Sequence, residues 1–234
     1  VRDPSRMAEV LNRVIEKAFR GSAPAQINVP RDYWTQVIDI ELPPIVRFER
    51  QGGGKEAIEN AAKLLSKAKF PVILSGAGVV LGGAIDECKK LAEKLDAPVC
   101  NGYQHNDSFP GSHPLAVGPL GYNGSKAAME LISKADVVLA LGTRLNPFST
   151  LPGYGIDYWP KKATIIQVDM NPDRIGLTKK VSVGICGDAK QVAQQILDKL
   201  SSDAGNTGRE ERKNLIHKTK SAWLQTLSGL DHEE

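Results

Sequence analysis

Between Lys55 and Leu200, short apolar runs alternate with stretches whose apolar residues recur at helical spacing. The runs are too short for helices and are bounded by glycine, proline or polar residues, as is typical of strands buried on both faces. We expect strands at 71–75, 97–100, 136–141, 163–169 and 181–186, and helices at 57–65, 85–95, 125–133 and 188–200. This alternation predicts an α/β fold with a doubly wound parallel sheet, which we assign to residues 55–200.

The segment before this region reads as the end of another domain. Apolar residues from Met7 to Ala18 have helical spacing, and Ala25–Val29 has the composition of a strand. One helix and one strand cannot bury their apolar faces alone, so we expect residues 1–34 to be the tail of a preceding domain. The chain also begins without methionine, which favours a fragment of a longer protein.

Two further segments predict linkers. Residues 35–54 lack periodicity and contain a proline pair and a triple glycine, which is typical of an interdomain linker. Residues 201–234 begin with a polar stretch and continue as a charged helix that we expect to lead toward a further domain.

Charge and cysteine content exclude several classes of function. The chain has 30 basic and 27 acidic residues, a net charge of +3, without the basic stripe of a nucleic-acid-binding protein. No apolar run approaches the length of a membrane span. Cys88, Cys100 and Cys186 lie far apart in apolar segments, so we expect buried free thiols and a cytoplasmic protein. Neither nucleic acid nor a membrane is an expected partner.

A ligand crevice is expected where the strands end. Ligands of open parallel sheets gather at the carboxyl ends of the strands, and several glycine, basic and acidic residues follow the expected strands directly. These candidate nucleotide-binding residues are Gly76, Ala77, Gly78, Gly142, Thr143, Arg144 and Asp169. The dinucleotide fingerprint itself is incomplete, because the third glycine, Gly82, falls one residue late.

Structural interpretations of the same residues remain open. The segment from Thr143 to Phe148 could be a bend carrying a surface arginine, and Asp169 could cap the turn from Pro172 to Ile175 instead of binding a ribose. Ser75 lacks the surroundings of a hydrolase nucleophile. The eight-residue spacing of His105 and His113 argues against a metal site, so we expect none.

Several motifs resemble thiamine-diphosphate-dependent enzymes. Residues 23–32 are similar to the closing strand of their pyrimidine-binding domain, with Ala23 in place of the usual glycine. Four further segments match their central domain in order and spacing: Pro71–Gly78, Ala135–Arg144, Ile165–Pro172 and Gly187–Ala189. The resemblance implies that residues 1–34 end the pyrimidine-binding domain and that residues 201–234 lead to the diphosphate-binding domain.

Finer motifs resemble one branch of the acetolactate-synthase-like enzymes. Three short motifs of that group, F-P, H-P-L and G-x-x-G, are present at Phe109-Pro110, His113–Leu115 and Gly118–Gly121. The segments Asn101–Asp107, Arg144–Phe148, Leu151–Gly155, Tyr158–Pro160 and Asn171–Gly176 resemble the sulfoacetaldehyde acetyltransferases. Synthase-like relatives more often carry acidic residues where Asn146-Pro147 stand here.

This resemblance implies a reaction and its cofactors. Enzymes of this branch use thiamine diphosphate and Mg²⁺ to convert sulfoacetaldehyde and phosphate into acetyl phosphate and sulfite, in taurine and sulfonate degradation. Gly187-Asp188-Ala189 lacks the second glycine of the G-D-G metal motif, and no activating glutamate motif occurs. We therefore expect both cofactors to be bound by absent domains, no catalytic residue in this chain, and no activity of the chain alone.

Three further implications complete the hypothesis. Flavin-containing relatives bind FAD along the candidate residues, but an acetyl transfer has no redox step, so FAD is possible and not expected to be needed. Active sites of this superfamily lie between subunits, which implies a homo-oligomer at full length. The alternatives are a fragment of an acetolactate-synthase-like carboligase or decarboxylase and, in another class, a free-standing nucleotide-binding flavoprotein module.

Overall fold

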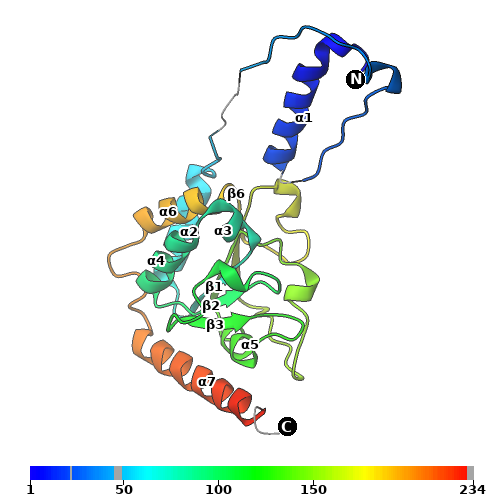
Figure 1. The fold of residues 1–234 in the computed structure, drawn as a ribbon. Helices are drawn as coiled ribbons and strands as arrows, with labels where there is room; N and C mark the ends of the chain where they lie inside the picture. Colours follow the sequence, from blue (N-terminus) through cyan, green and yellow to red (C-terminus); the bar gives the residue numbers. More distant parts are fainter. Residues whose placement is uncertain (22, 45–48, 231–234) are drawn as a thin grey trace. The chain divides into compact units, whose positions relative to one another are not determined.

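A computed structural model of the chain describes residues 1–21, 23–44 and 49–230 (Figure 1). The chain divides into two compact units, Val1–Glu49 and Arg50–Glu234, which we call unit 1 and unit 2. The sheet lies in unit 2, and it determines where a ligand could bind.

Unit 2 is built on a six-stranded parallel sheet with the order β3-β2-β1-β4-β5-β6. The strands are β1 Pro71–Ser75, β2 Val99–Asn101, β3 Ala116–Pro119, β4 Val137–Leu141, β5 Thr164–Asp169 and β6 Val183–Cys186. Every residue of β1 and β4 is buried, which accounts for their apolar composition. The predicted doubly wound parallel α/β fold is confirmed.

Helices cover the sheet in two groups. The helices of unit 2 are α2 Lys55–Lys67, α3 Ala77–Gly82, α4 Ile85–Leu95, α5 Lys126–Ile132, α6 Ala189–Lys199 and α7 Arg209–Leu230. Helix α6 packs against α2, α3 and α4, whereas α5 packs against α7. Figure 1 shows α5 on the opposite side of β1, β2 and β3 from α3 and α4. The buried faces of α2 and α4 carry the apolar residues whose spacing predicted them.

Two elements of unit 2 were not predicted. Strand β3 has the sequence Ala-Val-Gly-Pro at the edge of the sheet, where glycine and proline are tolerated but give no strand signal. Helix α3 occupies the stretch that we expected to be a glycine-rich turn. It is six residues long and is followed by the C-cap Gly83, whose φ of +65° is left-handed.

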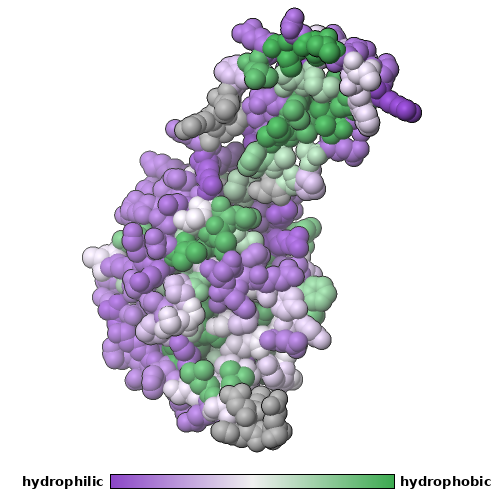
Figure 2. Space-filling model, in the orientation of Figure 1, coloured by the Kyte–Doolittle hydropathy of each residue, from purple (hydrophilic) through white to green (hydrophobic). Residues whose placement is uncertain are grey.

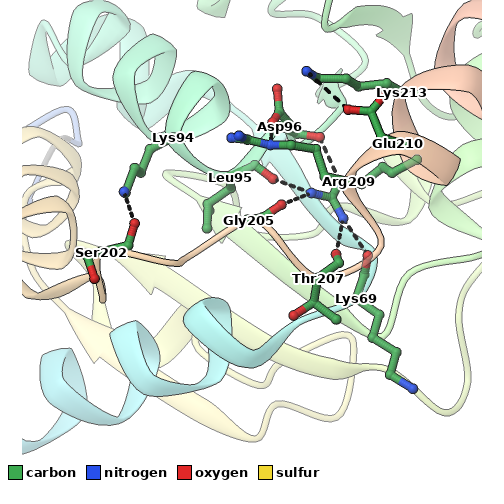
Figure 3. A network of polar contacts seen from close by, with 11 residues as sticks. Lys69, Lys94, Leu95, Asp96, Ser202, Gly205, Thr207, Arg209, Glu210 and Lys213 are labelled. Atoms are coloured by element: carbon green, nitrogen blue, oxygen red, sulfur yellow. Dashed lines mark hydrogen bonds and ion pairs between the residues drawn. The ribbon is translucent and has the colours of Figure 1, made fainter.

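The C-terminal helix α7 is joined to the body of unit 2 by a buried arginine. All five N–H groups of Arg212, which is 1% exposed, donate to backbone carbonyls. The acceptors belong to Lys69, Leu95, Asp96, Gly205 and Thr207, all of which are labelled in Figure 3. Two acceptors, Leu95 and Asp96, lie at the C-terminal end of α4, where the helix dipole favours a positive charge.

Unit 1 contains one long helix, α1 Met7–Gly21, as its sequence predicts. The predicted strand at Ala25–Val29 is wrong, because these residues form no strand. A strand needs a hydrogen-bonded neighbour, and no strand occurs in the described part of unit 1. No residue of α1 is buried, and hydrophobic side chains gather over this part of unit 1 in Figure 2.

The region predicted as a linker is divided between the two units. Its last residues pack within unit 2: Asp188 N donates to Gln51 O at 2.8 Å, and Gln195 Nε2 donates to Gly52 O at 2.8 Å. Arg50 also forms an ion pair of 3.0 Å with Asp188, which is 1% exposed. The assignment of residues 1–34, 35–54, 55–200 and 201–234 to separate domains stays a prediction.

The remaining short helices are 3₁₀ turns at Pro4–Arg6, Arg31–Tyr33, Asn106–Ser108, Pro147–Ser149 and Pro172–Arg174. None of the helices in the described residues combines the length and apolar character needed to cross a membrane.

Candidate functional site

The candidate crevice lies at the centre of the sheet, at the ends of β1 and β4. These two strands are neighbours, and the chain proceeds outward from them in opposite directions, to β2 and β3 on one side and to β5 and β6 on the other. Ligands of open α/β sheets bind at this switch point. The structure thus brings together Gly76, Ala77 and Gly78 after β1 with Gly142, Thr143 and Arg144 after β4.

The glycines at this point are required by contact between the two loops. A Cβ on Gly76 would lie 2.6 Å from Gly142 O, and a Cβ on Gly78 would lie 2.7 Å from Gly142 Cα. Gly78 N donates to Gly142 O at 2.8 Å, and Gly76 N donates to Leu141 O at 3.1 Å. Gly142 itself has a φ of +62°, which side chains rarely adopt. The backbone of each loop therefore occupies the space that a side chain on the other loop would need.

Thr143 is held by a buried polar network. It is 7% exposed, and its Oγ1 accepts a hydrogen bond from Leu145 N at 3.2 Å. Its carbonyl accepts from Gln167 Nε2 at 3.1 Å, while Gln167 also donates to Arg174 O and accepts from Gly176 N. Gln167 is 1% exposed and thus ties the loop after β4 to the loop after β5.

The charged candidates, Arg144 and Asp169, differ in their surroundings. The Arg144 side chain is exposed, and within the described residues it has no ion-pair or hydrogen-bond partner. Asp169 is 8% exposed, and its Oδ1 accepts from Asn171 N at 2.8 Å. The turn from Pro172 is capped by Asn171, whose Oδ1 accepts from Asp173 N, so Asp169 is not the cap of that turn.

A nucleotide fits this crevice only if the space left by the missing Cβ atoms of the glycines is open to a ligand. In a phosphate-binding loop, the absence of a Cβ lets the ligand approach the backbone. Here the positions of the missing Cβ atoms are occupied by the opposite loop, so the glycines fit loop packing better than an FAD cradle. Arg144 and Asp169 are the charged candidates for ligand contacts, and the site as a whole stays a prediction.

Ser75 and the histidines have structural partners. Ser75 is fully buried and donates to Ser108 O at 3.1 Å, while Asn101 Nδ2 donates to Ser108 Oγ at 2.9 Å. His113 Nδ1 accepts from Leu115 N, and its Nε2 lies 3.2 Å from Glu93 Oε1. In the described ranges, no group of three His, Cys, Asp or Glu residues is arranged to hold a metal ion.

The cysteines agree only in part with their prediction. All three are free, and Cys88 and Cys100 are buried, but Cys186 is partly exposed at the end of the edge strand β6. Burial raises the pKa of Cys88 to about 12 and also raises the pKa of Cys100. The two buried thiols are therefore protonated and unreactive at neutral pH.

An aromatic group at the same edge of the sheet was missed by the sequence reasoning. The ring centroid of Tyr103 lies 6.3 Å from that of Tyr122 and 6.3 Å from that of Phe148. These side chains follow β2, β3 and β4, so the parallel sheet places them together although they are distant in sequence. The signal that could have found them is an aromatic residue soon after each of three parallel strands, of which β3 and β2 are neighbours and β4 lies beyond β1.

The comparisons with known proteins agree with this architecture. Residues 58–196 match the family described as "Thiamine pyrophosphate enzyme, central domain". The chain belongs to this family of thiamine pyrophosphate enzymes. Benzoylformate decarboxylase from Polynucleobacter necessarius has a similar fold, with a TM-score of 0.74 and 22% identity, over 89% of this chain and 39% of that one.

Sequence relatives divide into two groups by name, sulfoacetaldehyde acetyltransferases and acetolactate synthases. A probable sulfoacetaldehyde acetyltransferase of Rhizobium meliloti is 79% identical over 234 residues, which are 100% of this chain and 40% of the relative. A sulfoacetaldehyde acetyltransferase of Roseovarius nubinhibens is 77% identical over 100% of this chain and 39% of the relative. A probable acetolactate synthase large subunit of Methanocaldococcus jannaschii is 34% identical over 98% of this chain and 38% of the relative. The chain thus spans about two fifths of the length of these relatives.

Proposed function

We propose that the chain is the central part of a thiamine-diphosphate-dependent acetyltransferase that converts sulfoacetaldehyde and phosphate into acetyl phosphate and sulfite. The observation that carries this proposal is the fall in identity from 79% and 77% for sulfoacetaldehyde acetyltransferases to 34% for an acetolactate synthase. The matches cover 100% of the chain for the two acetyltransferases and 98% for the synthase, so each comparison includes the loops as well as the buried strands. The reaction belongs to taurine and other sulfonate degradation in the cytoplasm.

The cofactors of the proposed reaction are held by other parts of the full-length protein. When bound, thiamine diphosphate would supply a nucleophilic carbanion, and Mg²⁺ would accompany it as the second cofactor. The described residues of this chain offer no cluster of metal-ligating side chains, and Asp188, the acid of Gly187-Asp188-Ala189, is engaged in capping α6 and pairing with Arg50. Activity of this chain alone is therefore not expected.

The contribution of this chain is to hold loops in place at the carboxyl edge of the sheet. Gln167 and the Gly78–Gly142 contact keep the loops after β1, β4 and β5 together without a ligand. Arg144 and Asp169 are retained as hypothetical contacts to a nucleotide, which the acetyl transfer does not need. The partners are the small-molecule substrates and further copies of the chain in a homo-oligomer, without nucleic acid or membrane.

Full-length protein tests the reaction directly. Supplied with thiamine diphosphate, Mg²⁺, sulfoacetaldehyde and phosphate, it should release sulfite and form acetyl phosphate in equal amounts. Formation of acetolactate from pyruvate without sulfite release from sulfoacetaldehyde would support the carboligase instead.

The isolated chain supplies a second comparison. It should bind none of these cofactors and turn over neither substrate. A yellow purified chain with bound FAD would favour the nucleotide-binding flavoprotein module, and an ADP or FAD titration followed by melting temperature would detect the same site without colour.

A further inference from the structure

Unit 2 exposes an aromatic surface beside the crevice that the proposed reaction does not explain. We call it the edge patch and define it as Tyr103, Tyr122, Phe148 and Tyr154. Tyr122 is 56% exposed, Phe148 57% and Tyr154 55%. Large aromatic side chains gathered in this way on the surface mark sites of interaction, because their burial by a partner is favourable.

The loops that carry the edge patch are held in place even though their side chains are exposed. Tyr122 N donates to Phe148 O at 3.1 Å, and Tyr103 N donates to Ser149 Oγ at 3.2 Å. The hydroxyl of Tyr154 donates to Gly124 O at 3.0 Å, which joins this side chain to the turn that carries Tyr122. The aromatic side chains are thus presented on ordered loops, so little conformational entropy would be lost when a partner covers them.

Helix α7 extends the apolar surface from the edge patch. The ring of Trp223 on α7 packs edge-on against Tyr154, with centroids 5.6 Å apart. Lys220 Nζ donates to the carbonyls of His113 and Pro114, which holds the same part of the helix to unit 2. Beyond this contact, Leu224 is 58% exposed and Leu227 39% exposed. The apolar surface therefore continues from the edge patch onto the last turns of α7.

We propose that the edge patch is the docking surface for the polypeptide that follows α7 in the full-length protein. The relatives are much longer than this chain, which covers 40% of one and 39% of another. Helix α7 ends at Leu230, seven residues or about 10 Å beyond Trp223 and its contact with Tyr154, so a segment tethered there has a high effective concentration at the patch. The matching surface on that segment is apolar, because the patch offers aromatic faces and only the tyrosine hydroxyls as polar groups. This inference does not depend on the identity of the reaction.

Photo-crosslinking in the full-length protein tests the proposal without weakening the fold. A benzophenone amino acid replaces Tyr122 in one sample and Leu81 in the control. Leu81 is 71% exposed on α3, outside the edge patch. Mixing isotopically heavy and light protein before irradiation separates contacts within one chain from contacts between copies.

The expected result is an adduct between position 122 and a segment downstream of α7 within the same chain, and none with that segment from position 81. An adduct to an upstream segment or between heavy and light chains would overturn the proposal, as would no adduct at position 122. As a second measurement, the double variant Tyr122→Ser, Phe148→Ser should accelerate protease cleavage after α7 several-fold relative to Leu81→Ser. Equal cleavage rates would contradict the proposal.

Discussion

The two units differ in whether their apolar side chains are buried. In unit 2, strands such as β4 are buried along their whole length between helices. In unit 1, helix α1 carries an apolar stripe of which no residue is buried, and Phe19 is 80% exposed. Both patterns are equally regular in the sequence, so periodicity identifies an element but does not show whether the same chain supplies the surface that covers it.

The difference also explains which elements formed without a partner surface. A helix satisfies its own backbone hydrogen bonds, so α1 forms from local pattern alone. A strand depends on a neighbour, and the predicted strand at Ala25–Val29 is absent from unit 1. That unit 1 is the tail of a preceding domain stays a prediction.

The largest effect is expected from the arginine that joins α7 to unit 2. Arg212→Ala removes a buried charge and leaves five backbone carbonyls without their donor. We expect a loss of about 3 kcal/mol or more in the free energy of unfolding, because unsatisfied buried polar groups each cost about 1–3 kcal/mol. Urea denaturation of the isolated chain, followed by circular dichroism, measures the change.

Its control lies one residue along the same helix. Lys213 is exposed and lies 3.9 Å from Glu210 in a surface ion pair, so Lys213→Ala should change stability by less than about 0.5 kcal/mol. An equally small loss of stability for both variants would contradict this prediction. It would mean that α7, like α1, adds little to the stability of the chain.

The second prediction concerns the contact between Gly78 and Gly142. Gly142→Ala and Gly83→Ala both place a side chain at positive φ, +62° and +65°, which costs about 1–2 kcal/mol. Only at Gly142 does the Cβ meet backbone, 2.7 Å from Gly78 Cα, and such overpacking costs about 1–3 kcal/mol more. Urea denaturation should therefore separate the two variants. Equal losses of stability would show that the space between Gly142 and Gly78 is open. The hypothesis that these glycines bind a nucleotide would then be favoured again.

Much of unit 2 was predictable, because its signals are local. Local sequence patterns were enough to predict the strands at 71–75 and 136–141 and the helices α2 and α4. Strand β3 was missed because its glycine and proline are acceptable only at a sheet edge, which is a property of the assembled fold.

The candidate site was predictable to a smaller extent. Its residues were correctly expected to lie at strand ends, but Gly76 and Gly78 pack against Gly142, a contact between segments more than 60 residues apart. The grouping of Tyr103, Tyr122 and Phe148 likewise depends on strand order. Sequence motifs predicted which residues follow the central strands, whereas long-range packing determines what those residues contact.

The third prediction tests how tightly the interior of unit 2 is closed. At pH 8, iodoacetamide should alkylate the partly exposed Cys186 well before Cys88 and Cys100, and mass spectrometry of the peptides gives the order. In guanidinium chloride all three should react alike. Native Cys88 reacting as fast as Cys186 would contradict a closed interior.

The same thiols predict a dependence of stability on alkaline pH. Burial raises the folded-state pKa of Cys88 from an ordinary value of 9.0 to about 12. Its contribution to stability is therefore complete below pH 9 and is lost as the pH rises from 9 through 12, because the unfolded state loses its proton first. Urea midpoints should fall across this range, and Cys88→Ala should reduce the slope.

The smallest effect is expected in unit 1, and it tests the comparison most directly. Ile15 is 46% exposed on the apolar stripe of α1, so Ile15→Ser in this chain should change the free energy of unfolding by less than about 0.5 kcal/mol. Lys17→Ser, at an exposed position of the same helix, is the matched control. In the full-length protein, burial of the isoleucine by a preceding segment would raise its cost to about 1.5–3 kcal/mol while the lysine variant stays unchanged. An equally small effect of Ile15→Ser in the full-length protein would mean that the stripe faces solvent there too, and that the contrast between the units is a property of unit 1 itself.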